Sequence, residues 1–264
     1  MNFGGLVKQI WNIFKEEYRM SIRRPGMWLA YGVIFLLYFY TMTLPERAEL
    51  PKVYDTATLW AISGVAVFEL NLFSPLLAGI STADRMVRDR TLKMDELLRS
   101  TPLTRWSYVL GKYTAALISM LTPLFLYVQV ISIFLIIKGA PIQIVWMNLV
   151  SFCALTLPAY AFVTAFSVAC PLVVPLRVYQ VLFTGYWFWG NYLNPGFIPT
   201  LAGTWLMPCG KIVLESLFRT TVMIDRLLRY TPFDALMNLI VLAACIVIIL
   251  TAAERWLAWK ARTA

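Results

Sequence analysis

The chain has 264 residues, of which 60% are hydrophobic and only 14% are charged. Soluble globular domains have about 45–50% apolar and about 25% charged residues, so this composition excludes an ordinary soluble domain and indicates several membrane spans. The chain has no histidine, which excludes Ser-His and Cys-His catalysis and histidine-based metal sites. Its formal charge of +9 fits the basic bias of cytoplasmic loops better than nucleic-acid binding.

Residues 1–24 predict an amphipathic helix at the membrane surface. Apolar side chains recur at helical spacing from Phe3 to Tyr18, and charged residues such as Lys8 and Lys15 lie among them. A helix of this kind lies in the plane of the interface, with its apolar side toward the acyl chains.

Six apolar stretches farther along predict six membrane-spanning helices. A spanning helix needs about 20 mostly apolar residues, and these stretches meet or approach that length. Two longer polar connections interrupt the series, at residues 81–107 and 194–232. The predicted spans are residues 27–44, 57–80, 110–137, 144–170, 178–193 and 233–253.

The connection 194–232 is predicted to lie on the outer side of the membrane. Within it, residues 211–230 carry charges mostly on one helical face, which predicts a second amphipathic helix on the outer leaflet. An alternative is that residues 197–214 form a seventh span, although two prolines and two glycines favour a broken, partly inserted segment. These four residues are Pro199, Gly203, Pro208 and Gly210.

The distribution of basic residues predicts the orientation. With six spans, most of the 23 Lys and Arg residues fall on the side that holds both termini and the connection 81–107. Cytoplasmic loops carry such an excess, so both termini are predicted to be cytoplasmic in a multi-pass protein of the plasma membrane. A seventh span at 197–214 would leave this charge balance unchanged and place the C-terminus outside.

The connection 81–107 is the most informative segment. It is dense in both basic and acidic residues, and it carries apolar residues such as Met86, Met94 and Leu97. This mixture suits a helix that docks into a groove on another protein. A solvated loop that only sets the topology is the simpler alternative.

Residues 95–112, DELLRSTPLTRWSYVLGK, resemble the stretch between the second and third spans of type-2 ABC transporter permeases. The features shared with this ABC exporter family are paired leucines, a small-residue–Pro–aliphatic step, a basic residue and a Gly-Lys pair. Here they are Leu97-Leu98, Thr101-Pro102-Leu103, Arg105 and Gly111-Lys112. A Gly-Thr-Leu-Glu run often precedes the leucines in this family, whereas this chain has Arg90-Thr91-Leu92-Lys93.

The resemblance implies one all-α permease domain over residues 1–264, with 81–107 as the cytoplasmic coupling loop. A separate ABC ATPase subunit would bind ATP and Mg, which fits the absence of a GxxxxGK[ST] motif from this chain. No catalytic residue is expected in the chain itself. The implied partners are ATPase subunits, a second permease subunit and membrane lipid, but no nucleic acid. The implied activity is export of a hydrophobic or amphipathic substrate, such as a peptide antibiotic, a lipid or a drug. The expected docking residues are Arg88, Asp89, Arg90, Asp95, Glu96 and Arg99.

Glu69 is a separate candidate, because it lies near the middle of the predicted span 57–80. Acidic residues within a membrane span are functional candidates by default. A place in the translocation path and a structural role, in which a hydrogen-bonded glutamate ties helices together, are both open.

Two alternative functions share most of these features. A membrane-embedded substrate-binding subunit of an energy-coupled importer would need a ligand pocket but no ATPase-docking loop of its own. A membrane anchor or sensor without transport would need neither. A membrane-embedded enzyme is disfavoured by the absence of histidine, of a GxSxG motif and of clustered acidic residues within the spans.

Overall fold

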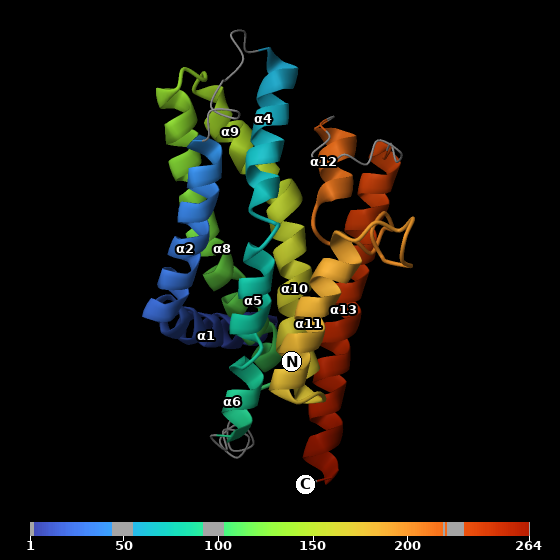
Figure 1. Ribbon diagram of the computed structural model, residues 1–264. Coiled ribbons are helices and arrows are strands. Elements are labelled where there is room, and N and C mark those ends of the chain that lie inside the picture. Colours follow the sequence, from blue (N-terminus) through green and yellow to red (C-terminus); the bar gives the residue numbers. More distant parts are fainter. Residues whose placement is uncertain (1–2, 44–54, 92–102, 219, 221–229, 264) are drawn as a thin grey trace.

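The computed structural model describes residues 3–43, 55–91, 103–218, 220 and 230–263, and all regular structure within them is helical. The predicted all-α fold class is confirmed for this part of the chain. The helices form a bundle with one helix lying across its lower end (Figure 1). They are α1 (Phe3–Ile22), α2 (Pro25–Thr43), α4 (Thr56–Glu69), α5 (Ser74–Thr82), α6 (Arg85–Thr91), α8 (Arg105–Ile137), α9 (Gln143–Ser151), the π-helix η1 (Phe152–Thr156), α10 (Leu157–Ala169), the 3-10 helix η2 (Cys170–Leu172), α11 (Leu176–Asn191), α12 (Lys211–Leu217) and α13 (Pro232–Thr263).

The predicted N-terminal helix is present as α1, which lies across the lower end of the bundle at a steep angle to α2 (Figure 1). The chain turns between them because Pro25 disfavours a helical backbone in the residue before it and then suits the first position of a new helix. Where α1 lies relative to a membrane stays a prediction.

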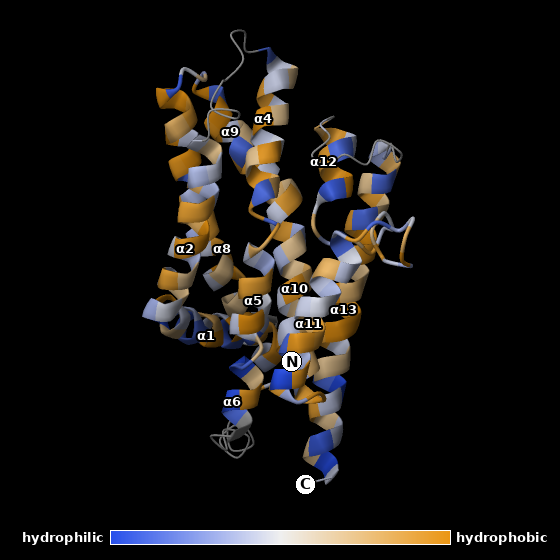
Figure 2. Ribbon diagram, viewed as in Figure 1, coloured by the Kyte–Doolittle hydropathy of each residue, from blue (hydrophilic) through white to orange (hydrophobic). Residues whose placement is uncertain are grey.

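Four helical segments are long and apolar enough to cross a membrane: α2, α8, the continuous run Gln143–Leu172 and α13. Their outward faces are rich in large apolar side chains, such as Leu29 and Leu36 on α2 and Val247 and Ile248 on α13. Hydrophobic residues predominate in the middle of the bundle, whereas hydrophilic residues lie at α6 and at the end of α13 (Figure 2). This distribution matches an apolar layer bounded by two polar surfaces.

The predicted span 57–80 is not one straight helix. It is divided into α4 and α5 by residues 70–73, and the two parts are bent by 41° when α5 and α6 are taken together. The break falls where Asn71 turns its side chain toward other segments and where Pro75, in the first turn of α5, has no N–H for a continuous helix.

The predicted fifth span, 178–193, corresponds to α11, which has 16 residues. A helix of that length extends about 24 Å, which is shorter than the about 30 Å of a bilayer's hydrocarbon core. The described residues therefore hold four long apolar helices, or five with the bent pair, rather than the six predicted.

The alternative of a seventh span at 197–214 is wrong, because residues 192–210 form turns and only α12 is helical. Of the predicted surface helix over 211–230, residues 219 and 221–229 lie outside the described part, so the prediction is open there. Its described helical part, α12, is buried at Ile212, Val213 and Leu214 and packs against α13 and α4. Gly64 of α4 permits this approach, since a Cβ there would lie 2.8 Å from Leu214 Cδ1.

The predicted loop 81–107 is partly helical. The helix α5 continues to Thr82, α6 follows, and α8 begins at Arg105 after Thr104, whose hydroxyl accepts a hydrogen bond from the N–H of Ser107 at 3.2 Å. Residues 92–102 lie outside the described part. A short helix of mixed charge is thus present where docking was predicted.

Gly79 of α5 lies against Phe183 of α11, since a Cβ there would overlap the Phe183 ring. We predict that Gly79→Ala lowers stability by about 1–3 kcal/mol through overpacking. Thermal unfolding in detergent measures this loss, and adding Phe183→Leu should restore part of it. The control is Gly185→Ala on α11, where no atom lies within 4 Å. Equal midpoints for the Gly79 and Gly185 variants would contradict the prediction.

Candidate functional site

Lys112, near the start of α8, is the centre of a buried ionic cluster. The lysine is 2% exposed, and its Nζ lies 2.6 Å from Glu17 Oε1 of α1 and 2.7 Å from Asp89 Oδ2 of α6. The hydroxyl of Tyr108 donates to the same Asp89 oxygen at 2.8 Å, and the Tyr108 ring lies 5.5 Å from the Lys112 nitrogen. We call these four residues the Lys112 cluster. A single cation thus joins α1, α6 and α8, and Glu17 of α1 is 95 residues away from it in the sequence.

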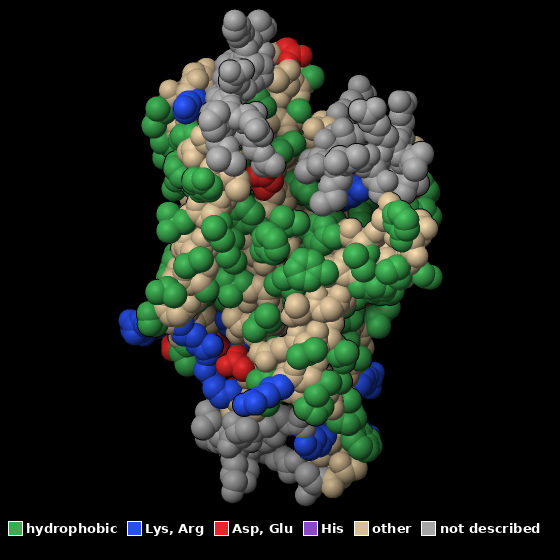
Figure 3. All heavy atoms as spheres, viewed as in Figure 1, with side chains coloured by type: hydrophobic (Ala, Val, Ile, Leu, Met, Phe, Trp, Pro, Cys, Tyr) green, Lys and Arg blue, Asp and Glu red, His purple; other side chains and the backbone are tan. Residues whose placement is uncertain are grey.

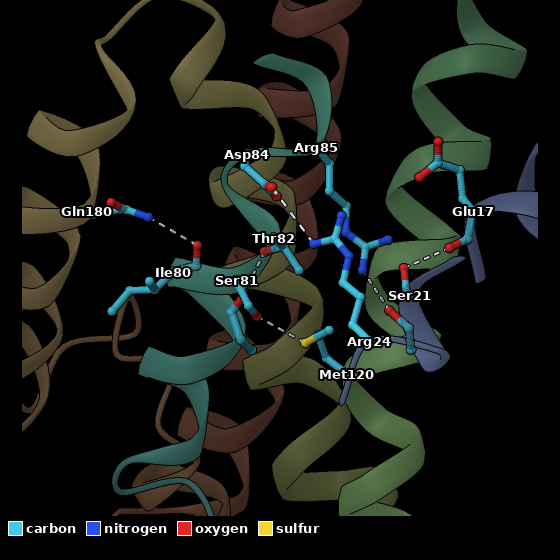
Figure 4. Close-up of polar contacts among 12 residues, drawn as sticks. Glu17, Ser21, Arg24, Ile80, Ser81, Thr82, Asp84, Arg85, Met120 and Gln180 are labelled. Carbon is cyan, nitrogen blue, oxygen red and sulfur yellow. Dashed lines mark hydrogen bonds and ion pairs between the residues drawn. The ribbon is translucent and has the colours of Figure 1, made fainter. Parts of the chain in front are cut away.

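Arg85 adds a second buried cation beside this cluster. It is 2% exposed, interacts electrostatically with Glu17, and donates from Nη2 to Ser119 Oγ of α8 at 3.0 Å. Two carboxylates and two cations therefore balance one another in this region. Figure 4 shows Arg85 extending from the junction of α5 and α6 toward α1. Nearby, the pair of Arg24 and Asp84 is longer, at 3.8 Å, and more exposed, so it adds little stability (Figure 4).

The helix α1 packs closely along the first turns of α8. Gly111 makes this possible, since a Cβ there would lie 2.8 Å from Ile13 Cβ and 3.3 Å from the carbonyl oxygen of Ile10. Gln9 Oε1 accepts hydrogen bonds from the N–H of Thr104 at 3.3 Å and from Ser107 Oγ at 3.0 Å. The Gly-Lys pair of the sequence motif therefore has a structural role, in which Gly111 admits α1 and Lys112 holds it.

The break between α4 and α5 forms a second polar region. The amide of Asn71, which is fully buried, donates to the carbonyl oxygens of Leu155 at 3.2 Å and Cys209 at 3.0 Å. The backbone groups that the break frees also have partners. Tyr192 donates to the Asn71 carbonyl and Trp187 to the Leu72 carbonyl, each at 3.0 Å, while the Phe73 N–H donates to the Tyr38 hydroxyl at 3.1 Å. Side chains from α2 and from the end of α11, together with the Leu155 and Cys209 carbonyls, hold this break in place.

Glu69 is the last residue of α4, directly before this break, and its side chain is half-buried. It interacts electrostatically with the hydroxyl groups of Tyr38 and Tyr127. The candidate therefore lies at the bend between α4 and α5 rather than in the middle of a straight helix.

Residues 11–256 match a family model described as ABC-2 family transporter protein. This match covers most of the chain. The chain belongs to the ABC-2 transporter family. Comparison with curated proteins and with solved structures returned no match. Membership identifies a membrane-embedded permease component of an ABC transporter, which is not itself a nucleotide-binding domain and which works with ABC ATPase subunits.

The structure divides the predicted docking residues of this permease into three groups. Asp89 is buried in the Lys112 cluster, so its charge is engaged within the chain, and we no longer assign it to docking. Arg88 is half-buried on α6, and Arg90 belongs to the same helix. Asp95, Glu96 and Arg99 lie outside the described residues. Docking by these five residues stays a prediction.

Glu17, Tyr108 and Lys112 are not among the functional residues that the sequence predicted. Two signals were available: a lysine that enters a span beside a glycine, and a glutamate on the apolar side of the N-terminal helix. Each charge needs a partner when it is buried.

A cavity of about 330 Å³ lies between α10, α11, α13 and the turns before α12. Its lining is aromatic and aliphatic, which suits a hydrophobic molecule better than a polar one. Within the described ranges, no group of three or more Cys, Asp or Glu side chains could hold a metal ion. The cavity is lined by Phe162, Phe166, Tyr179, Leu182, Phe183, Tyr186, Leu201, Leu206 and Cys245.

We predict that Lys112→Met destabilises the permease by about 3–5 kcal/mol, because it leaves two buried carboxylates without their cation. Thermal unfolding in detergent measures the effect. The triple variant Glu17→Gln, Asp89→Asn, Lys112→Met should recover much of the loss, since it removes all three charges together. Lys138→Met, at the exposed far end of α8, is the matched control and should change little. A Lys112 variant as stable as the Lys138 variant would contradict the prediction.

Proposed function

We propose that this permease couples ATP hydrolysis by a separate ABC ATPase to movement of a substrate across the plasma membrane, through α6 and the Lys112 cluster. The observation that carries the proposal is the buried contact of Lys112 with Asp89 of α6 and Glu17 of α1. Breaking such a pair leaves an uncompensated buried charge, so α6, α1 and the start of α8 move together.

The chain path supports transmission from α6 to the membrane interior. The helix α5 leads directly into α6, with only Ala83 and Asp84 between them, and α5 begins at the break where Asn71 is anchored. A displacement of α6 by an ATPase therefore reaches the bend between α4 and α5. Bends of this kind act as hinges in transporters, because a few residues absorb the change of angle.

The remaining parts of the proposal come from the family resemblance and from the distribution of basic residues. ATP and Mg would be bound by the ATPase subunits, and a second permease subunit, identical or homologous, would complete the translocation path between two ATPases. The lower end of the molecule, which holds α6 and the C-terminus, carries a band of Lys and Arg below a largely hydrophobic middle (Figures 1 and 3). This supports a cytoplasmic location for both termini and α6.

The substrate class that we propose is hydrophobic or amphipathic, such as a peptide antibiotic, a lipid or a drug, and the direction is export. The apolar cavity beside α11 supports this class, because its lining offers aromatic and aliphatic contacts. The same cavity would also suit a substrate-binding importer subunit, whereas a membrane anchor or sensor needs no cavity.

The first test is purification of the permease from its native membrane in mild detergent. We predict that an ABC ATPase co-purifies and that Arg88→Glu or Glu96→Arg reduces its recovery roughly tenfold or more, because like charges then oppose across the interface. Arg177→Glu, an exposed cation at the start of α11, is the matched control. An ATPase that is retained by every variant would contradict docking through α6 and the residues after it. A lack of any ATPase would favour the importer-subunit alternative.

The second test concerns Glu69. We predict that Glu69→Cys, with the four native cysteines replaced by alanine, is labelled by a membrane-impermeant maleimide added outside, because a residue of the translocation path is exposed to water. Ser63→Cys is the control, since Ser63 of α4 is fully buried and bonds to Ser151 at 2.7 Å. If both positions resist the reagent, Glu69 has a structural role only.

A further inference from the structure

The side chains of α1 divide into three faces. One face, which includes Ile10, Ile13 and Glu17, packs against α8. The next face is aromatic: Trp11 stacks on Phe14 at 5.2 Å between ring centroids, and Phe14 stacks on Tyr18 at 5.6 Å. Trp11 is 59% exposed and turns outward from the protein, whereas Phe14 and Tyr18 are half-buried and the Tyr18 hydroxyl lies 3.2 Å from Thr122 Oγ1 of α8.

The third face is basic. Lys8, Lys15 and Arg19 are all exposed, and their spacings of seven and four residues place them in one stripe on the helix. The acidic residues of α1 are only two, and Glu17 is turned inward to Lys112, which leaves Glu16 as the exposed acid of this helix. The packing of Glu17 thus removes a negative charge that would otherwise weaken the stripe.

We propose that this basic stripe binds the phosphate groups of anionic phospholipids in the cytoplasmic leaflet. An exposed tryptophan beside a basic face is the pattern of a helix that lies at the boundary of headgroups and acyl chains. The helix α1 crosses the lower end of the bundle (Figure 1). In the proposed orientation, Trp11 reaches this boundary and the stripe lies at headgroup level. The choice of leaflet rests on the orientation proposed above.

The charge of the headgroup decides which lipid binds. A zwitterionic headgroup carries its own cation beside the phosphate, whereas phosphatidylglycerol and similar lipids carry a net negative charge. Each Lys or Arg near such a surface strengthens binding about fivefold, so three of them strengthen it about a hundredfold. The attraction is also screened by salt.

The test uses the full-length permease in an uncharged detergent, titrated with dioleoyl phosphatidylglycerol or dioleoyl phosphatidylcholine. Native mass spectrometry counts the bound lipids, and the thermal unfolding midpoint reports saturation. We expect preferential binding of phosphatidylglycerol. The variant Lys8→Gln, Lys15→Gln, Arg19→Gln should need about a hundredfold more of this lipid for half-saturation, with binding of phosphatidylcholine unchanged. All three residues are exposed, so folding should be preserved.

The matched control is Arg255→Gln, Lys260→Gln, Arg262→Gln, which removes three exposed cations from the end of α13. This control should bind phosphatidylglycerol as the wild type does. Equal losses of phosphatidylglycerol binding in both triple variants would show that only the net charge of the protein matters, which would overturn the proposal. Equal binding of phosphatidylglycerol and phosphatidylcholine by the wild type would also overturn it. Displacement of the lipid by inorganic phosphate at constant ionic strength would identify a free-anion site instead. Wild-type indifference to phosphatidylglycerol, with loss of a co-purifying ATPase in the α1 variant, would identify a protein-docking face instead.

Discussion

The arrangement of this permease depends on the neutralisation of one buried cation. A lysine at 2% exposure loses its hydration, and transfer of an isolated charge into a protein interior costs several kcal/mol even after relaxation. Glu17 and Asp89 offset that cost only if α1 and α6 come to the start of α8 together. The positions of a peripheral helix and of a short helix after a bent span are therefore linked by the same requirement. Gly111 allows α1 to come close enough for Glu17 to reach Lys112, since any larger residue would hold α1 away from α8.

A second constraint acts deeper in the bundle. The hydrocarbon core of a bilayer supplies no hydrogen-bond partners, so a break in a span survives only where protein groups satisfy the freed backbone. Tyr38 of α2, Trp187 of α11 and Tyr192 directly after α11 supply these partners. Because these partners come from outside the broken span, the bend depends on how its neighbours pack. A change in that packing would therefore alter the angle between α4 and α5, which is the property that a hinge requires.

The spacing and clustering of residues along the sequence predicted the helices whose formation depends on neighbouring residues. The helical spacing of apolar residues located α1, and long uncharged stretches located α2, α8 and α13. The break at 70–73 was missed because its partners, such as Leu155 and Cys209, are 84 and 138 residues away. Asp89 was taken for a docking residue because it stands in a charged segment, whereas its burial is decided by Lys112. Likewise, the charges of α12 predicted a surface helix, yet Lys211 and Glu215 pair with each other at 3.8 Å and one face of α12 is buried at Ile212, Val213 and Leu214.

The two constraints meet at opposite ends of α5. This helix has nine residues, about 14 Å, and such a short helix does not bend appreciably along its length. Its start is anchored through Asn71, and its end leads through Arg85 and Asp89 into the buried ion pairs. A displacement imposed on α6 would therefore shift α5 as a rod, and Gly79 of α5 lies against Phe183 of α11. Since the apolar cavity shares Phe183 with that contact, movement of α5 would also change the shape of the cavity.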